Sequence, residues 1–176
     1  MAINSSDNQH TTNTQPHTMS YRFTIIITGP AASGKSTLIK SLQSKGFKAA
    51  KLYTTRPSRS EEDKEYWFIN DRQFNAEFIN EPFKHQYNGW WYVLTIYAYF
   101  YNDVFALGPH MTRQVIDFLK ANSLPYMVIY CTAARETRYK RMIERGDDYA
   151  EVIRRLGADD RDFADFTEYD IKHVTD

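Results

Sequence analysis

Cysteine is almost absent from the chain: Cys131 is the only one among 176 residues. A single cysteine cannot form an internal disulfide, and its neighbours are apolar, so we expect a buried, reduced thiol within a strand. The five histidines have no metal-ligand spacing with one another or with Cys131. The sequence therefore predicts no structural metal, and it is compatible with a cytoplasmic protein.

A net charge is also lacking, because 22 lysines and arginines balance 22 aspartates and glutamates. This balance excludes the broad positive field of a general nucleic-acid or membrane-surface binder. The longest aromatic and apolar run, residues 90–101, is too short and too polar to span a bilayer. We expect a soluble protein with no nucleic-acid or membrane partner, in which any anion-binding site is local.

Residues 1–20 contain neither lysine nor arginine and have no apolar segment. They are rich in Asn, Thr, Ser, Gln and His, a composition that fits neither a signal peptide nor a transit peptide. Such a polar stretch cannot offset the entropy of ordering it, which predicts a disordered tail. The remaining residues, 21–176, suffice for one compact domain.

Apolar, β-branched runs alternate with segments of helical character after the predicted tail. The predicted strands of this part cover residues 23–28, 47–54, 103–107, 126–132 and 169–174. Helices are predicted at residues 36–43, 134–145 and 149–162, and a further helix begins at Gly108-Pro109. Since parallel strands need crossover connections, this alternation predicts an α/β fold with a parallel sheet core flanked by helices.

Residues of about 52–101 interrupt the alternation. A short strand at 65–69 precedes a helix that begins at 70–71 and carries Phe74, Phe78 and Ile79 at helical spacing. Two further strands within 83–96 are joined by Asn88-Gly89, a pair typical of tight hairpin turns. We expect an inserted small mixed-strand lobe, which is a natural site for a second substrate.

Aromatic residues are concentrated in this lobe. We expect most of them to form its hydrophobic core, because a small lobe needs large side chains for stability, with a base-stacking wall as the alternative. The residues concerned are Trp90, Trp91, Tyr97, Tyr99, Phe100 and Tyr101.

A phosphate-binding motif follows the first predicted strand and opens a helix, which is the context that a true phosphate loop requires. Its eight residues are Gly29-Pro30-Ala31-Ala32-Ser33-Gly34-Lys35-Ser36. The glycines let the backbone approach phosphate, and the exposed N–H groups stabilise the anion. We expect Lys35 to reach the β- and γ-phosphates of ATP and the Ser36 hydroxyl to coordinate Mg²⁺. Thr37 is either a ligand of the α-phosphate or a simple first-turn residue.

Two arginines stand three residues apart in the segment Thr54-Thr55-Arg56-Pro57-Ser58-Arg59. A planar fork that remains charged suits bidentate recognition of phosphate. Taken alone, two loop arginines near Glu61-Glu62 also fit a solvated charge cluster. The wider pattern of the chain favours the phosphate site.

A phosphate loop, then Thr-Thr-Arg-Pro-x-Arg with a downstream Tyr-x-Phe, then an arginine-rich helical pair, resembles the guanylate kinase family of nucleoside monophosphate kinases. The resemblance covers about residues 22–173 and is best over 27–38, 53–68 and 138–163. It implies a core that carries ATP, a nucleotide-monophosphate lobe at about 52–101 and a helical lid at about 134–150.

The resemblance also implies roles for particular residues. Those that match the family's acceptor-phosphate ligands are Arg56, Arg59, Tyr66 and Tyr92. Those that match the arginines neutralising charge on the transferring phosphoryl group are Arg141, Arg145 and Arg155. For Arg141 and Arg145, a solvated helix face with an i, i+4 like-charge pair is the alternative.

The residues that recognise guanine in the family are not retained. Leu52 stands where the family has a hydroxyl residue, and Phe83 or Lys84 stands where it has an acid. Val93 stands in place of the family's turn glycine, and Gly108 in place of its aspartate. Glu81 and Thr95 take the places of the family's guanine ligands only if the alignment with the family is shifted locally. A guanine N1–H left unpaired against an apolar side chain costs about 1–3 kcal/mol. We therefore expect a different or modified base, with GMP or dGMP read in another way as the alternative.

The function predicted is the transfer of the γ-phosphate of ATP, with Mg²⁺, to a nucleoside monophosphate by a monomer or homodimer. One alternative is a sugar phosphate kinase of the ribose 1,5-bisphosphate type. That family resembles this chain in the region where the chain differs from the guanylate kinases, including a glycine near Gly108. A second is a guanylate kinase-like module that has lost catalysis and binds peptides. The intact Lys35 and Ser36 argue against the second.

Overall fold

The computed structural model describes residues 23–58 and 63–175. The predicted tail at residues 1–20 and the predicted phosphate ligand Arg59 lie outside the described residues.

A four-stranded parallel sheet forms the core of the protein. Its strand order is β6 (Val104–Ala106), β1 (Thr24–Thr28), β7 (Tyr126–Thr132) and β8 (Ile171–Val174). The central strand β1 has the sequence TIIIT and is buried along its whole length, as expected for a strand covered on both faces. The predicted α/β fold with a parallel core is confirmed.

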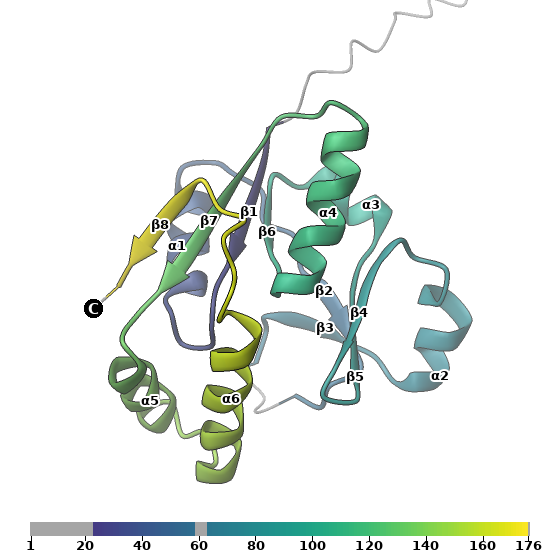
Figure 1. Ribbon diagram of the computed structural model, residues 1–176. Helices are drawn as coiled ribbons and strands as arrows, with labels where there is room; N and C mark the ends of the chain where they lie inside the picture. The colour runs from purple at the N-terminus through teal and green to yellow at the C-terminus, as the bar shows by residue number, and fades with distance from the viewer. Residues whose placement is uncertain (1–22, 59–62, 176) are drawn as a thin grey trace, which may run out of the picture.

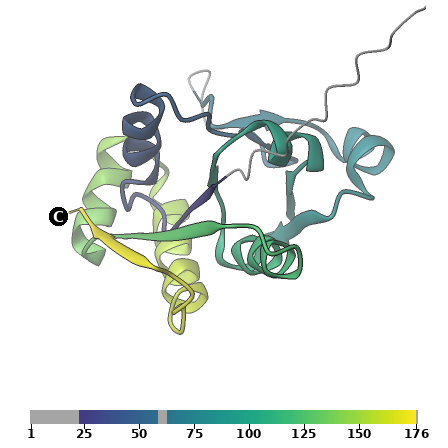
Figure 2. The ribbon, with the colours of Figure 1, turned by 90° about the horizontal axis from the view of Figure 1, so that it is seen from above.

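Two helices cover opposite faces of this sheet (Figure 2). Helix α1 (Lys35–Ser44) packs through Leu38, Ile39 and Leu42 against a cluster that includes Cys131 of β7. Helix α4 (Pro109–Ala121) buries an apolar stripe, including Met111, Val115 and Leu119, on the other face. Burial also raises the pKa of the Cys131 thiol, which agrees with the buried, reduced cysteine predicted from the sequence.

A second, mixed sheet forms the small lobe beside the core (Figure 1). Its order is β3 (Tyr66–Phe68), β2 (Leu52–Thr54), β5 (Trp90–Leu94) and β4 (Phe83–Tyr87). Only β2 and β3 are parallel, and the other two pairs are antiparallel. The strand predicted at 47–54 is divided: Ala49 makes an isolated bridge to Val104 of the core sheet, whereas β2 belongs to the second sheet.

Short helices connect the strands of the small lobe. Asn70 caps α2 (Asp71–Gln73), which continues as a π-helix, η1 (Phe74–Phe78). Phe74 and Phe78 are buried as predicted, but Ile79 follows the π-helix and is exposed, because the wider turn shifts it off the buried face. Thr95 caps α3 (Ile96–Tyr101).

The prediction that the aromatic cluster is mostly core is wrong for half of its members. Tyr99 is buried against Phe83 and Phe105, and Trp91 stacks on Phe74 at 4.5 Å. The residues that lie on the solvent side of α3 are Tyr97, Phe100 and Tyr101, which are 68%, 54% and 59% exposed. A helix of this length presents only one face to the core, so the others remain outside.

The last two helices form a pair at one end of the core sheet (Figure 1). Helices α5 (Arg135–Glu144) and α6 (Tyr149–Asp162) share a buried cluster of Met142, Val152 and Leu156. Gly146 turns the chain between them at a φ of 83°. Over residues 23–58 and 63–175, no helix combines the length and the apolar character needed to cross a membrane.

Candidate active site

The phosphate-loop motif connects β1 to α1, as the sequence predicts. Gly29 has a φ of +143°, and a Cβ there would lie 2.0 Å from the carbonyl oxygen of Cys131. Gly34 has a φ of +91° and stands at the N-terminus of α1, where a Cβ would meet Thr175. The loop therefore needs glycine at both positions to fit between β7 and the C-terminal segment.

The Lys35 ammonium lies within this loop. Its Nζ donates to the carbonyl oxygens of Gly29 and Pro30, both at 2.7 Å. Burial lowers the pKa of Lys35, and the nearby Asp159 carboxylate opposes that effect. A cation held against backbone carbonyls at the end of a helix is placed to exchange those contacts for phosphate oxygens.

A single cavity of about 690 Å³ joins the phosphate loop to the small lobe. This volume is within the range of small-molecule sites. Every described residue that the sequence predicts as a ligand lines it, except Pro30. These residues are Gly29, Ala31, Ala32, Ser33, Gly34, Lys35, Ser36, Thr37, Arg56, Tyr66, Tyr92, Arg141, Arg145 and Arg155.

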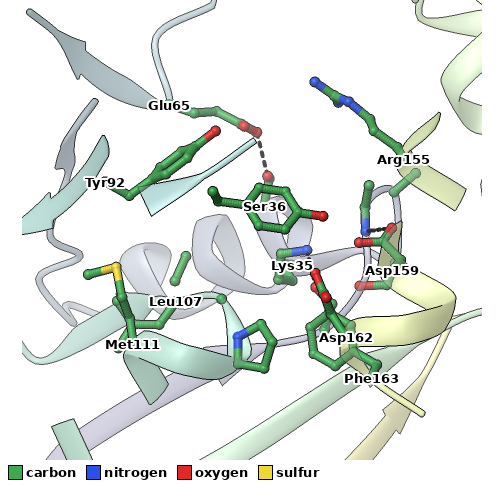
Figure 3. A pocket seen from close by; sticks show the side chains of 18 of the residues that line it. Lys35, Ser36, Glu65, Tyr92, Leu107, Met111, Arg155, Asp159, Asp162 and Phe163 are labelled. Carbon is green, nitrogen blue, oxygen red and sulfur yellow. Dashed lines mark hydrogen bonds between the residues drawn. The ribbon is translucent and has the colours of Figure 1, made fainter. Parts of the chain in front are cut away.

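The Ser36 hydroxyl donates a hydrogen bond to Glu65 Oε1 at 2.6 Å. Glu65 immediately precedes β3 of the small lobe, whereas Ser36 is in the first turn of α1 (Figure 3). This contact therefore connects the core to the small lobe beside the phosphate loop.

The Arg56 side chain is buried at the small-lobe side of the cavity. It forms an ion pair with Asp63 at 3.0 Å, with both side chains almost fully buried. Its guanidinium carbon lies 5.3 Å from the centre of the Tyr66 ring. The buried Nε of Arg56 has no hydrogen-bond partner among the described residues. Arg56 itself lines the cavity, and a guanidinium that remains charged suits an anion.

Arg141 connects the phosphate loop to the end of the chain. Its Nη1 donates to the Ala32 carbonyl oxygen at 3.1 Å and to the Thr175 hydroxyl at 2.9 Å. Thr175 in turn donates to the Ser33 carbonyl oxygen at 3.1 Å. Arg141 is therefore more than a solvated helix-face residue, although these contacts alone are structural.

Arg145 and Arg155 are held by two acidic residues, Asp147 in the turn between α5 and α6 and Glu151 in the first turn of α6. Arg145 pairs with Asp147, and Arg155 Nε donates to Glu151 at 2.7 Å. Arg154 also pairs with Glu151 at 2.7 Å, and these two arginines, Arg154 foremost, lower the pKa of that carboxyl to about 2. The site-facing arginines are thus already positioned by a charge network.

Helix α6 contributes an acid that sequence reasoning missed. Asp159 Oδ2 accepts a hydrogen bond from the Ala31 amide at 2.7 Å and lies 3.3 Å from Arg138 Nη1. Burial raises the pKa of Asp159, and the Ala31 amide and Lys35 oppose that shift. The Asp159 carboxylate therefore accepts a hydrogen bond from a backbone N–H of the loop that is predicted to bind phosphate.

A second contact between the lobes involves the hairpin of the small lobe. The Tyr87 hydroxyl interacts with the Asp162 carboxylate at the end of α6. Burial first, and Asp162 second, raise the pKa of Tyr87 to about 12. The neighbouring His85 ring stacks on His110 of α4 at 4.3 Å. Burial and the His110 charge lower the pKa of His85.

The positions that correspond to guanine ligands are apolar or structural. Leu52 and Gly108 line the cavity, whereas Phe83 is buried in the core cluster. Glu81 accepts from the Ile96 amide and Thr95 caps α3, so both support the helix and neither lines the cavity.

The remaining residues that sequence reasoning missed include Tyr87, His85 and His110. For the two acids of α6, the spacing in the sequence did carry a signal. Asp159 and Asp162 follow the predicted ligand Arg155 at i+4 and i+7, which places all three on one face of a helix. Figure 3 shows this face across the cavity from Tyr92 and Met111.

Among the described residues, no three His, Cys, Asp or Glu side chains gather as a metal-binding group. Mg²⁺ does not require such a cage, since it is commonly held by one or two protein oxygens together with substrate phosphates. Ser36 and Glu65 offer two hard oxygen ligands in contact with each other beside the phosphate loop, so the residues present fit the ion.

A family model described as guanylate kinase matches residues 21–176. The chain belongs to the guanylate kinase family. The resemblance stated from the sequence is confirmed, and membership indicates a nucleotide kinase, a transferase. No curated protein is significantly similar to the chain in sequence.

Two solved structures extend the comparison. Guanylate kinase from Anaplasma phagocytophilum matches with a TM-score of 0.63 and 15% identity, over 89% of this chain and 78% of that chain. A structure named APE1195 matches with a TM-score of 0.39 and 15% identity, over 87% of this chain and 85% of that chain. At such identity the first match supports the fold alone.

Proposed function

We propose that the protein transfers the γ-phosphate of ATP to a nucleoside monophosphate. The observation that carries this proposal is a single cavity. It contains the phosphate loop with Lys35 and four arginines from the α5–α6 pair on one side, and Arg56 with two tyrosines on the other. A site for a triphosphate and a site for a second phosphate thus face each other, which is what transfer between two nucleotides needs.

The donor triphosphate binds along residues 29–36. The exposed amides at the N-terminus of α1 and the Lys35 ammonium hold its β- and γ-phosphates. For this to happen, Lys35 leaves the carbonyls of Gly29 and Pro30, and Asp159 releases the Ala31 amide.

The acceptor phosphate binds between Arg56, Tyr66 and Tyr92. Arg56 supplies a charged guanidinium, and the tyrosine hydroxyls add hydrogen bonds to phosphate oxygens. Arg59 is proposed as a further ligand on the family pattern alone, because it lies outside the described residues.

In the transfer step, an oxygen of the acceptor phosphate forms a bond to the γ-phosphorus while the bond from that phosphorus to the β,γ-bridging oxygen breaks. ADP leaves with the electron pair of the broken bond, and the product is a nucleoside diphosphate. No covalent enzyme intermediate is needed, so the protein acts by positioning and charge stabilisation. We assign that stabilisation to Lys35, Arg141, Arg145 and Arg155.

Guanylate kinases generally use Mg²⁺ with ATP, and in this protein the Ser36 hydroxyl, which lines the cavity, would hold the ion. Bound there, Mg²⁺ would supply positive charge that stabilises the transferring phosphoryl group. Thr37, which lines the same cavity, is proposed as an α-phosphate ligand.

The acceptor base proposed here differs from guanine. Leu52 and Gly108 offer no side-chain partner to the guanine N1–H and amino groups, and Phe83 lies in the core instead of the cavity. The polar groups near this end are His85, Tyr87 and His110. Leaving a guanine donor unpaired costs about 1–3 kcal/mol, which corresponds to about tenfold or more in specificity.

One observation favours a second candidate function, phosphorylation of a sugar bisphosphate. The stacked His85 and His110 rings bring two imidazoles to the acceptor end of the cavity. Imidazole N–H groups donate to phosphate oxygens, so a second phosphate of an acceptor such as ribose 1,5-bisphosphate would find partners there.

A substrate panel tests these functions. ADP release is measured with ATP, Mg²⁺ and each nucleoside or deoxynucleoside monophosphate, and with ribose 1,5-bisphosphate. Turnover with a monophosphate other than GMP or dGMP is expected. Turnover with the sugar bisphosphate alone would favour the second candidate. Absence of turnover and of thermal stabilisation by ATP with Mg²⁺ would favour a binding module.

A further inference from the structure

The strands beside the phosphate loop lack the acid that commonly helps to hold Mg²⁺. In phosphate-loop enzymes a serine or threonine of the loop and an aspartate from the core hold the ion together. Here β1 is flanked by β6 and β7. At its carboxyl end, β6 continues into Ala106-Leu107-Gly108, and β7 continues into Thr132-Ala133-Ala134. Neither of these carboxyl-terminal stretches contains a carboxylate side chain.

Three other acids near the cavity are engaged elsewhere. Asp159 accepts from the Ala31 amide and pairs with Arg138. Asp162 interacts with Tyr87 of the hairpin. Asp63 pairs with the buried Arg56. None of these contacts involves the Ser36 hydroxyl.

Glu65 is the acid that contacts the metal-binding hydroxyl. Its Oε1 lies 2.6 Å from Ser36 Oγ, and its side chain lines the same cavity as the phosphate loop (Figure 3). Because Ser36 donates its hydrogen to this carboxylate, the lone pairs of the hydroxyl oxygen remain available to a cation. A hydroxyl and a carboxylate are also the hard oxygen ligands that Mg²⁺ prefers.

We propose that Glu65 is the carboxylate that holds Mg²⁺ together with Ser36 when ATP is bound. This inference rests on the proposed function, since the ion arrives with the triphosphate. It assigns the metal a second role, because Glu65 belongs to the small lobe and Ser36 to the core. The ion therefore ties the acceptor-binding lobe to the ATP-binding core at the moment when both substrates must be aligned.

The test measures metal binding without turnover. ATP binding to the wild-type protein and to Glu65→Gln is followed by calorimetry, first with EDTA and then over a Mg²⁺ titration. Mn²⁺ bound to the ATP complex is followed by electron paramagnetic resonance. The matched control is Glu77→Gln, which removes the same charge from an exposed position of η1 outside the cavity lining.

Glu65→Gln is expected to bind ATP in EDTA as the wild type does. The affinity of its ATP complex for Mg²⁺ and Mn²⁺ should fall about 10–100-fold, the usual effect of losing a group that supports a metal. Glu77→Gln should match the wild type throughout. Glu65→Asp, which keeps the charge, should lose less metal affinity than Glu65→Gln, and it supplies the test if the glutamine variant folds poorly.

The outcomes separate this inference from the proposed function. If both Glu65 variants bind the metal as tightly as the wild type while Mg²⁺ strengthens ATP binding, the assignment of Glu65 is overturned and the proposed function stands. If wild-type protein binds no ATP with or without Mg²⁺, the proposed function itself fails.

Discussion

The Asp159 carboxylate accepts a hydrogen bond from the Ala31 amide at 2.7 Å, so an acid from α6 lies against the loop proposed to bind a triphosphate. The same carboxylate pairs with Arg138, and Arg138 also pairs with Asp160 at 3.2 Å. A negative charge at this amide competes with a phosphate oxygen for the same donor. The two anions also repel each other, by about 1–4 kcal/mol for charges about 4 Å apart between bulk water and a protein surface.

Asp159→Asn should therefore bind ATP more tightly. The amide side chain keeps an acceptor for Ala31 but removes the charge, so we expect the Kd for ATP to fall about tenfold, equivalent to ~1.4 kcal/mol. Calorimetry with ATP and Mg²⁺ measures this, and the melting temperature verifies that Arg138 remains accommodated by Asp160. Weaker ATP binding by a stably folded variant would mean that Asp159 assists the nucleotide.

Lys35→Ala should abolish phosphoryl transfer. The Nζ lies between the loop carbonyls and is the cation proposed to follow the transferring phosphate. Loss of a single group that stabilises transition-state charge typically lowers kcat by about 10²–10³-fold, and we expect at least that. The control is Lys40→Ala, an exposed lysine of the same helix, which should retain full kcat.

Arg56→Lys should impair the acceptor and spare ATP. The charge that pairs with Asp63 is kept, but the fork with the unsatisfied Nε is lost. A hydrogen bond to a charged group contributes about 1.5–3 kcal/mol, so KM for the acceptor should rise about tenfold or more. Arg72→Lys, on the exposed surface of α2, is the matched control. An equal loss of ATP and acceptor binding would contradict the division between the two sites.

Gly29→Ala should destabilise the protein and disturb the loop. The new Cβ would meet the Cys131 carbonyl at 2.0 Å, at a φ that side chains rarely adopt. Overpacking of this kind costs about 1–3 kcal/mol. For a domain of this size each kcal/mol lowers Tm by roughly 2–4 °C. Gly108→Ala, with a φ of −72° and nothing within 4 Å, changes only the N-cap of α4 and should lower Tm less than Gly29→Ala does.

The Glu151 network should lose its stabilising effect in acid. The arginine contacts lower the pKa of Glu151 from an ordinary 4.5 to about 2 in the folded protein. A carboxyl whose folded pKa is depressed stabilises the fold fully above pH 4.5 and loses that contribution as pH falls through about 2. The difference in unfolding free energy between wild type and Glu151→Gln should therefore be largest at neutral pH and shrink below pH 4.5. A difference that is constant with pH would exclude the ion pairs as its source.

Local sequence signals predicted much of this architecture. The β-branched run before Gly29 and the helical residues after Gly34 are neighbours in the chain, so strand, loop and helix could be placed before any long-range contact was known. The same holds for the hairpin turn at Asn88-Gly89. The π-helix turn at Phe74 was not predictable in this way, because it changes the period on which the pattern depends.

The contacts within the site were harder to predict, because most of them join distant segments. Asp159 and Ala31 are 128 residues apart in sequence, and Thr175 and Ser33 are 142 apart. Periodicity indicates that Arg155 and Asp159 share a helix face, but not that this face meets the phosphate loop. Resemblance to a family supplied the arginines at the matched positions, whereas residues to which the family motifs assign no role, such as Glu65 and His85, required the fold.

The central claim is that one cavity aligns ATP with the phosphate of a nucleotide. Its most direct test follows the γ-phosphate of isotopically labelled ATP during incubation with Mg²⁺ and a panel of nucleoside monophosphates. The account predicts that the label appears in a nucleoside diphosphate in equal amount to the ADP formed, and that Lys35→Ala prevents both. Label released only as inorganic phosphate, or recovered only in a sugar phosphate, would contradict it.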